Sequence, residues 1–164
     1  MEPAGVVIRS AVPEDLAFLR RMLYEAANRP GTEWPAFEAS MEEPRNRRFW
    51  SGWMRAGDIG AVAEVGTTPV GAAWARRFAG DELSPIDDPD VPVLAIGVEA
   101  GYRGRGIGGL LLDALIEQAR GNGVRALSLT TGLFNEAALR LYRRRGFVEV
   151  SRRGEGVHMR LVLD

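Results

Sequence analysis

The residues best suited to chemistry lie in a glycine- and arginine-rich stretch, Arg103-Gly-Arg-Gly-Ile-Gly108. An apolar run of strand length, residues 91–98, comes before it, and an amphipathic helical pattern begins at Ile107. A strand, a glycine loop and a helix N-terminus in this order present free backbone N–H groups and the positive end of a helix dipole to an anion. Because Arg103 and Arg105 add positive charge, this stretch is predicted to bind a pyrophosphate group.

Three of the glycines, Gly104, Gly106 and Gly109, also satisfy G-x-G-x-x-G, a fingerprint of dinucleotide binding that is weak on its own. The fingerprint places its first glycine directly after the strand, whereas residues 99–103 intervene here. It also requires an acid about 20 residues further on, after the next strand, and the predicted strand at residues 125–131 contains none. A P-loop is excluded because it requires a lysine, which the chain lacks.

The same stretch, taken as Arg-x-x-Gly-x-Gly before a helix, resembles the acetyl-CoA loop of the GNAT superfamily of N-acetyltransferases through Arg103, Gly106 and Gly108. A second segment, residues 135–147, is similar to the family's pattern Asn-x-x-Ala-x-x-Leu-Tyr-x-x-x-Gly-Phe in residue types and spacing. Two independent motifs in the family's order make this resemblance specific. It covers residues 59–150 well and the preceding residues only in general layout.

The resemblance implies that acetyl-CoA is the co-substrate and that an acetyl group passes to a primary amine by direct attack on the thioester. It also implies that the amide of Val98 faces the thioester carbonyl, where a preorganised N–H could lower the barrier by ~3 kcal/mol. Gly97 marks a bulge, a close backbone approach or simple packing of a small residue, and Asn135 could serve only as a helix N-cap. The implied coenzyme contacts are Ile96, Gly97, Val98, Arg103, Gly104, Arg105, Gly106, Ile107, Gly108 and Asn135.

Tyr142 is the candidate general acid, a role that the resemblance implies. A phenol with an ordinary pKa of about 10 is protonated at neutral pH and can donate a proton to the leaving thiolate. The alternative is a packed tyrosine whose hydroxyl lies at the rim of the site. No general base is visible, because Thr130 stands where many family members carry an acid, and His158, the single histidine, is more typical of a structural residue. Four acids could supply a base, although none is favoured: Glu33, Glu64, Asp81 and Glu82.

Composition excludes several classes of protein. The chain has no cysteine, which rules out disulfides and a cysteine acyl-enzyme, and its single histidine argues against a metal site. No apolar run approaches the ~20 residues of a membrane helix, and the N-terminus has no signal-peptide pattern. We therefore expect one cytoplasmic domain over residues 1–164, without a metal, a nucleic-acid partner or a membrane partner. The resemblance adds the possibility of a homodimer.

Charge and aromatic residues are unevenly distributed along the chain. Residues 1–92 carry a net charge of −5 and residues 93–164 one of +4. The basic half suits an anionic coenzyme, and the acidic half, including the loop at residues 76–92, could steer a cationic acceptor, unless these charges are solvated surface. Three of the four tryptophans lie within residues 32–58, which form either a wall of the acceptor pocket or ordinary core.

The predicted elements describe an α/β (α+β) domain with a mixed, mainly antiparallel sheet, helices on both faces and, by resemblance, a splayed central strand. The first helix begins at Pro13 and should bury Leu16, Leu19, Leu23 and Ala27. The other predicted elements are strands at 6–8, 58–65, 70–75, 93–98, 125–131, 147–151 and 157–163, and helices starting at 107 and 135. Two other functions stay open: a non-catalytic acyl-CoA-binding sensor or scaffold, and an NAD(P)-dependent enzyme.

Overall fold

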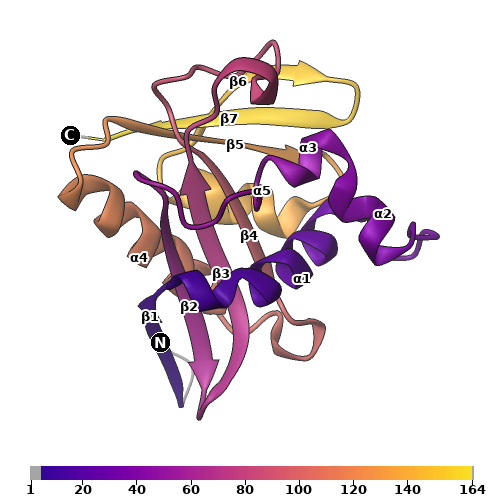
Figure 1. Cartoon of the computed structure of the whole chain (residues 1–164), viewed down its shortest axis with the longest axis vertical. Helices are drawn as coiled ribbons and strands as arrows, with labels where there is room; N and C mark the ends of the chain where they lie inside the picture. The colour runs from indigo at the N-terminus through magenta and orange to yellow at the C-terminus, as the bar shows by residue number, and fades with distance from the viewer. Residues whose placement is uncertain (1–4, 164) are drawn as a thin grey trace.

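The computed structural model describes residues 5–163, which form one seven-stranded sheet flanked by helices (Figure 1). The strand order is β1-β2-β3-β4-β5-β7-β6, and every neighbouring pair is antiparallel except β4 and β5. This topology confirms the predicted mixed, mainly antiparallel sheet. The strands are β1 (Val6–Ser10), β2 (Ile59–Val65), β3 (Thr68–Arg76), β4 (Val93–Val98), β5 (Ala126–Gly132), β6 (Val148–Arg153) and β7 (Gly156–Val162).

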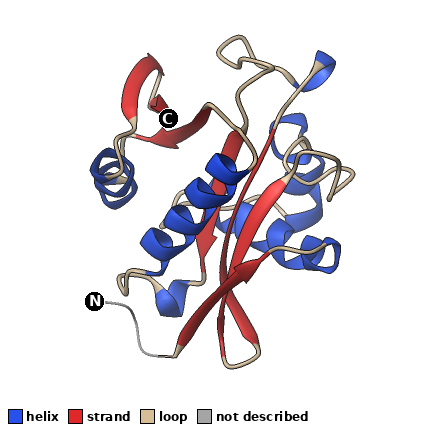
Figure 2. Ribbon diagram, turned by 90° about the vertical axis from the view of Figure 1, so that its left-hand side faces the viewer, coloured by secondary structure: helices blue, strands red, loops and turns tan. Residues whose placement is uncertain are grey.

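Helices cover both faces of the sheet (Figure 2). Residues of α1 (Leu16–Ala27) and α2 (Phe37–Glu42) form one core cluster with β2 and β3, next to the short α3 (Pro44–Arg47). Residues of α4 (Ile107–Gly121) and α5 (Glu136–Arg144) form the larger cluster on the opposite face. No described helix is long and apolar enough to cross a membrane.

The buried face of α1 differs in part from the predicted stripe. Leu19 and Leu23 are buried as expected, but Phe18 and Met22 complete the buried face. Leu16 is only half-buried, and Ala27 is exposed. The prediction for Ala27 is wrong because the last turn of α1 lines an open cleft instead of packing on the sheet.

The central strands β4 and β5 separate almost as soon as they meet. Their only register pair joins Val93 to Ser128, and the Ser128 N–H donates to the Pro92 carbonyl at 3.0 Å. From Leu94 onward β4 pairs with β3 alone. The expected splay of the central strand is therefore confirmed, and it opens the sheet between the two helical layers.

The aromatic segment before β2 is mostly core. Trp53 is buried, and Phe37, Phe49 and Trp50 pack against the cluster that contains α1. Among these, only Phe49 lines the cleft between β4 and β5. Residues 32–58 therefore combine both predicted roles. Most of their aromatic side chains pack in the core, and the part near α3 contributes to the wall of the cleft.

Candidate active site

A cleft of about 790 Å³ occupies the place where β4 and β5 diverge. Its walls come from β4, from β5, from the last turn of α1, from the glycine loop at residues 103–106 with the start of α4, and from α5. It therefore gathers segments that lie far apart in the sequence. All predicted site residues except Arg105 line it, namely Ile96, Gly97, Val98, Arg103, Gly104, Gly106, Ile107, Gly108, Asn135 and Tyr142.

The glycine loop ends in a helix N-terminus that opens on this cleft. Gly104 and Gly106 have φ angles of +75° and +83°, in the left-handed region that favours glycine. Gly106 is the N-cap of α4 and accepts a hydrogen bond from the Leu110 N–H at 3.2 Å. The N–H groups that precede Leu110 in the first turn have no intrahelical acceptor, because an α-helix leaves them free. The cleft thus carries anion-binding geometry at one end.

The two loop arginines take different positions. The Arg103 Nε donates to the Val98 carbonyl at 3.0 Å, and its Nη2 lies 3.3 Å from Glu25 of α1. The Arg105 guanidinium lies 5.1 Å from the ring centre of Tyr102 and is not part of the cleft wall. Arg103 is therefore the loop cation that stands directly at the cleft.

Strand β4 presents alternate backbone groups to the cleft. The Glu99 N–H donates to the Val70 carbonyl of β3 at 2.8 Å. Because backbone groups alternate between the two neighbours of a strand, Gly97 pairs with β3, whereas Ile96 and Val98 direct their N–H and C=O groups toward the open side. The β3–β4 register is regular through Gly97, so this glycine marks a close approach and not a bulge.

Tyr142 is both packed in the core and part of the cleft wall. Its side chain is 5% exposed and its ring lies 5.7 Å from that of Phe147, yet it lines the cleft. Burial raises the pKa of its phenol well above the ordinary value, so the group keeps its proton across the neutral and mildly alkaline range. Asn135 caps α5, because its Oδ1 accepts from the Ala138 N–H at 3.2 Å, and it also faces the cleft.

The four acids considered as bases, Glu33, Glu64, Asp81 and Glu82, lie away from the cleft wall. Two carboxylates that sequence reasoning missed do line it. Glu25 contacts Arg103, and Glu155 lies 3.7 Å from Arg29. Glu155 lies in the Gly-Glu-Gly turn between β6 and β7, and the two glycines are a sequence signal for such a turn. No sequence signal distinguishes Glu25 from the other acids of the first helix.

The acidic loop before β4 does not reach the cleft either. Within the described chain, none of residues 76–92 lines it. Their carboxylates engage arginines instead: Asp87 pairs with Arg48 at 2.5 Å, and Glu82 pairs with Arg55 at 2.9 Å. These acids hold the loop against the segment after α3, away from the cleft wall.

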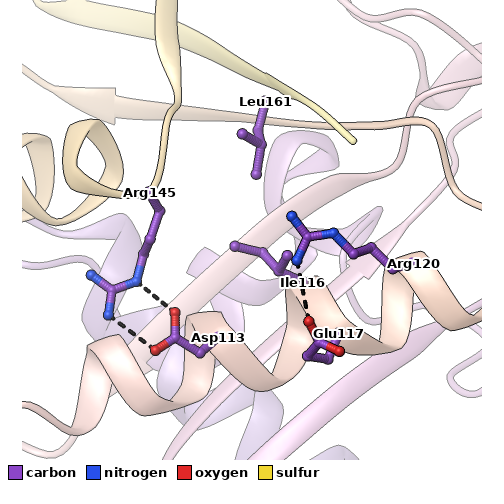
Figure 3. A pocket seen from close by; sticks show the side chains of 6 residues that line it. All are labelled: Asp113, Ile116, Glu117, Arg120, Arg145 and Leu161. Atoms are coloured by element: carbon purple, nitrogen blue, oxygen red, sulfur yellow. Dashed lines mark hydrogen bonds and ion pairs between the residues drawn. The ribbon is translucent and has the colours of Figure 1, made fainter. Parts of the chain in front are cut away.

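A smaller pocket of about 240 Å³ lies between α4, Arg145 at the end of α5, and Leu161 of β7 (Figure 3). Its charged groups are paired, since Arg145 holds Asp113 at 2.8 and 3.2 Å and Arg120 holds Glu117 at 3.1 Å. Among the described residues, no group of three or more acids and histidines could hold a metal ion. The cleft between β4 and β5 is therefore the candidate active site.

Comparison with known proteins agrees with this geometry. A family model described as the acetyltransferase (GNAT) family matches residues 21–147. The chain belongs to this family. The matched residues include the glycine loop at residues 103–108, the segment at residues 135–147, and the diverging strands β4 and β5.

Individual GNAT relatives differ in length from this chain. It is 38% identical over 122 residues to N-alpha-acetyltransferase RimI of Mycobacterium tuberculosis, covering 73% of this chain and 65% of the relative. It is 36% identical over 110 residues to the mycothiol acetyltransferase of Propionibacterium freudenreichii, covering 67% of this chain and 33% of the relative. The chain thus spans between a third and about two thirds of the curated relatives it matches.

Solved GNAT structures share the fold over almost the whole chain. The ribosomal-protein-alanine N-acetyltransferase from Brucella melitensis has a TM-score of 0.67 at 27% identity and covers 96% of this chain and 99% of its own. A phosphinothricin acetyltransferase from Sinorhizobium meliloti in complex with AcCoA has a TM-score of 0.71 at 22% identity, covering 97% of this chain and 89% of its own. At that identity the second likeness concerns the fold alone.

Proposed function

We propose that this GNAT chain is an acetyl-CoA-dependent N-acetyltransferase that moves an acetyl group to a primary amine by direct attack on the thioester. The observation that carries the proposal is the splay of β4 from β5, which opens a cleft with a helix N-terminus at one end and Tyr142 in its wall. Family membership and the anion-binding geometry of the loop support the same reading.

Acetyl-CoA would supply the activated acetyl thioester, and the residues of the cleft fit its chemistry. The first-turn N–H groups of α4 and the Arg103 guanidinium would bind the pyrophosphate. The Ile96 backbone groups, which have no β5 partner, would pair with the pantetheine arm, whereas the Val98 carbonyl is already held by the Arg103 Nε. A fixed N–H at Val98 would also stabilise negative charge on the thioester oxygen during attack, worth ~3 kcal/mol of barrier.

Tyr142 would donate its proton to the departing thiolate. Its raised pKa keeps the phenol protonated, and its place in the cleft wall puts it on the same surface as Val98. The sequence contains no cysteine, so a mechanism through a cysteine acyl-enzyme is not available. This agrees with direct transfer of the acetyl group from the coenzyme to the amine.

The acceptor is proposed only as a primary amine on a small molecule or a peptide. We keep a cytoplasmic location and a possible homodimer as parts of the proposal. The NAD(P) alternative is not favoured, because β4 and β5 form the sheet's one parallel pair and separate after a single register pair. The sensor alternative keeps the same coenzyme contacts and differs in predicting no turnover.

Thiol release from acetyl-CoA, followed with a thiol-reactive dye, tests the proposal. The panel should contain small polyamines, amino acids and peptides with a free N-terminus. Because the protein has no cysteine, it contributes no background signal. Release that depends on an acceptor is expected and would identify its class. Tight acetyl-CoA binding by calorimetry, with no release across the panel, would favour the sensor.

A further inference from the structure

One hydroxyl in the cleft wall is paired with the single histidine of the chain. Thr130 of β5 lies directly opposite His158 of β7 in the strand register, and its Oγ1 is 3.4 Å from the His158 Nδ1. Thr130 is exposed and lines the cleft, whereas His158 is 7% exposed and stands behind it. A contact of this length does not exclude a catalytic role, because catalytic hydrogen bonds often tighten only when substrate binds.

Two charged groups influence the His158 ring, Asp87 of the loop before β4 and Arg160 of β7. Burial lowers the pKa of His158 below its ordinary value, the charge of Asp87 and the Leu129 carbonyl oppose this effect, and Arg160 adds to it. Asp87 is itself held by Arg48. The imidazole is therefore neutral at pH 7 and can accept a proton, and the Asp87 carboxylate favours the imidazolium when it forms.

The Arg160 side chain, on the same strand as His158, has its own partner. Its Nη2 lies 4.0 Å from Asp88 of the neighbouring loop, and 40% of the Arg160 side chain is exposed. Arg160 therefore acts on His158 through a partly screened charge. This exposed position makes it a useful site for changing the field at the ring without disturbing the core.

The proposed reaction requires a proton acceptor that the rest of the cleft does not offer freely. An amine with an ordinary pKa near 10.4 enters as an ammonium ion and must lose a proton before it can attack. The two carboxylates in the cleft wall, Glu25 and Glu155, are paired with Arg103 and Arg29.

We propose, resting on the proposed function, that Thr130 and His158 form a proton relay that deprotonates the acceptor ammonium. The Thr130 Oγ1 accepts a proton from the ammonium while its own hydroxyl proton passes to the His158 Nδ1. The ammonium becomes a neutral amine, and the imidazole becomes an imidazolium. Thr130 is the group that touches the acceptor, and His158 acts through it.

The remaining steps balance without another reagent. The amine nitrogen bonds to the acetyl carbon, the carbon–sulfur bond breaks, and Tyr142 protonates the thiolate. The nitrogen that attacked still carries one proton more than a neutral amide, and it gives this proton to the Tyr142 phenolate, which becomes a phenol again. The proton held on His158 leaves through Thr130 to water once the product has departed, so each turnover releases one proton to solvent.

The pH dependence of kcat tests the relay with the acceptor found in the thiol-release panel. The wild-type profile should show a plateau that falls on the acid side with an apparent pKa below 6.5. His158→Gln and Thr130→Val should lose this plateau, so that kcat rises with pH throughout the range, and kcat at pH 7 should fall by about 100-fold or more. Thr130→Ser, which retains a hydroxyl, should recover the plateau that Thr130→Val loses.

Arg160→Gln provides a second readout that a purely structural role for His158 would not move. Because Arg160 lowers the pKa of His158, its removal should shift the acid limb of the profile to higher pH. Melting temperature and acetyl-CoA affinity, measured for every variant, separate loss of the relay from loss of folding.

The single histidine also allows a test without turnover. Nitrogen chemical shifts of the imidazole should show a neutral ring protonated on Nε2, with the Nδ1 lone pair facing Thr130. A ring protonated on Nδ1, or an unchanged acid limb in His158→Gln, would overturn the relay and leave the transferase proposal standing. A wild-type protein that acetylates no acceptor would overturn both.

Discussion

A Cβ atom added to Gly97 of β4 would lie 2.7 Å from the backbone carbonyl oxygen of Met22 in α1. That oxygen belongs to the helix backbone and cannot rotate away, so the helix itself would have to move. Since the last turn of α1 lines the cleft, this glycine determines how closely one wall of the site approaches the strand beneath it.

Gly97→Ala should therefore destabilise the protein by about 1–3 kcal/mol, as overpacking of a close contact does, and should reduce turnover by displacing α1. Gly101→Ala is the matched control, because a Cβ there meets nothing within 4 Å. Urea denaturation and the thiol-release assay measure the two effects. Equal stability of the two variants would contradict the assigned contact.

Gly106→Ala should weaken acetyl-CoA binding, because alanine at a φ of +83° costs about 1–2 kcal/mol and distorts the start of α4. Gly123→Ala, at a φ of +73° beyond the other end of α4, imposes similar strain far from the cleft. Both variants should lose similar stability, and only Gly106→Ala should lose affinity by calorimetry. A parallel loss of affinity in Gly123→Ala would argue that the loop has no special role.

Tyr142→Phe should lower kcat by about 10²–10⁴-fold and leave acetyl-CoA affinity unchanged. An acid must be protonated to act, and the pKa of Tyr142 is raised. Wild-type activity should therefore show no decline attributable to this group up to about pH 10. Tyr24→Phe is the control, since its hydroxyl donates to the Pro35 carbonyl away from the cleft. Unchanged kcat in Tyr142→Phe would remove the acid assignment.

Asp58→Asn should destabilise the protein by about 3–5 kcal/mol, because it leaves the buried Arg76 guanidinium without its counter-charge. Arg76 Nη2 lies 2.6 Å from Asp58, and the two side chains are 0% and 1% exposed. Glu117→Gln, which breaks a largely exposed pair with Arg120, should cost less than about 1 kcal/mol. Chemical denaturation of both variants makes the comparison, and similar losses would contradict it.

Stability at low pH should depend on Asp15 before α1. Burial raises the pKa of this carboxyl, but two Arg9 hydrogen bonds of 2.8 Å and the Val12 N–H outweigh burial and hold the pKa below its ordinary value. The ionised group therefore stabilises the fold above about pH 3.9, and this contribution disappears as the pH falls further. Asp15→Asn should be less stable at pH 7 and should approach the wild type by pH 2. A difference in denaturation midpoint that stays constant with pH would contradict this.

The glycine loop and the helix starts at the cleft could be predicted because their determinants are local. Glycines at left-handed φ before a helix, and Asn135 at the first turn of α5, depend on residues within a few positions of one another. The same locality explains why the limits of most strands and helices were predicted to within a few residues.

The burial of α1 shows where local patterns are insufficient. Phe18 and Met22 complete its packed face, although the predicted stripe named Leu16 and Ala27. Helical periodicity identifies an apolar side, but the tilt of the helix on the sheet decides which turns remain covered. Here the close approach of Met22 to Gly97 sets that position.

The sequence by itself determined the family pattern, the glycine loop before α4 and the order of the elements, because these depend on short-range backbone preferences. Only the tertiary structure decided which groups meet in the cleft. Arg103 reaches Glu25 across 78 positions, and Thr130 meets His158 across 28. Strand register and helix packing control such encounters, and they result from the simultaneous burial of apolar surface by the whole chain.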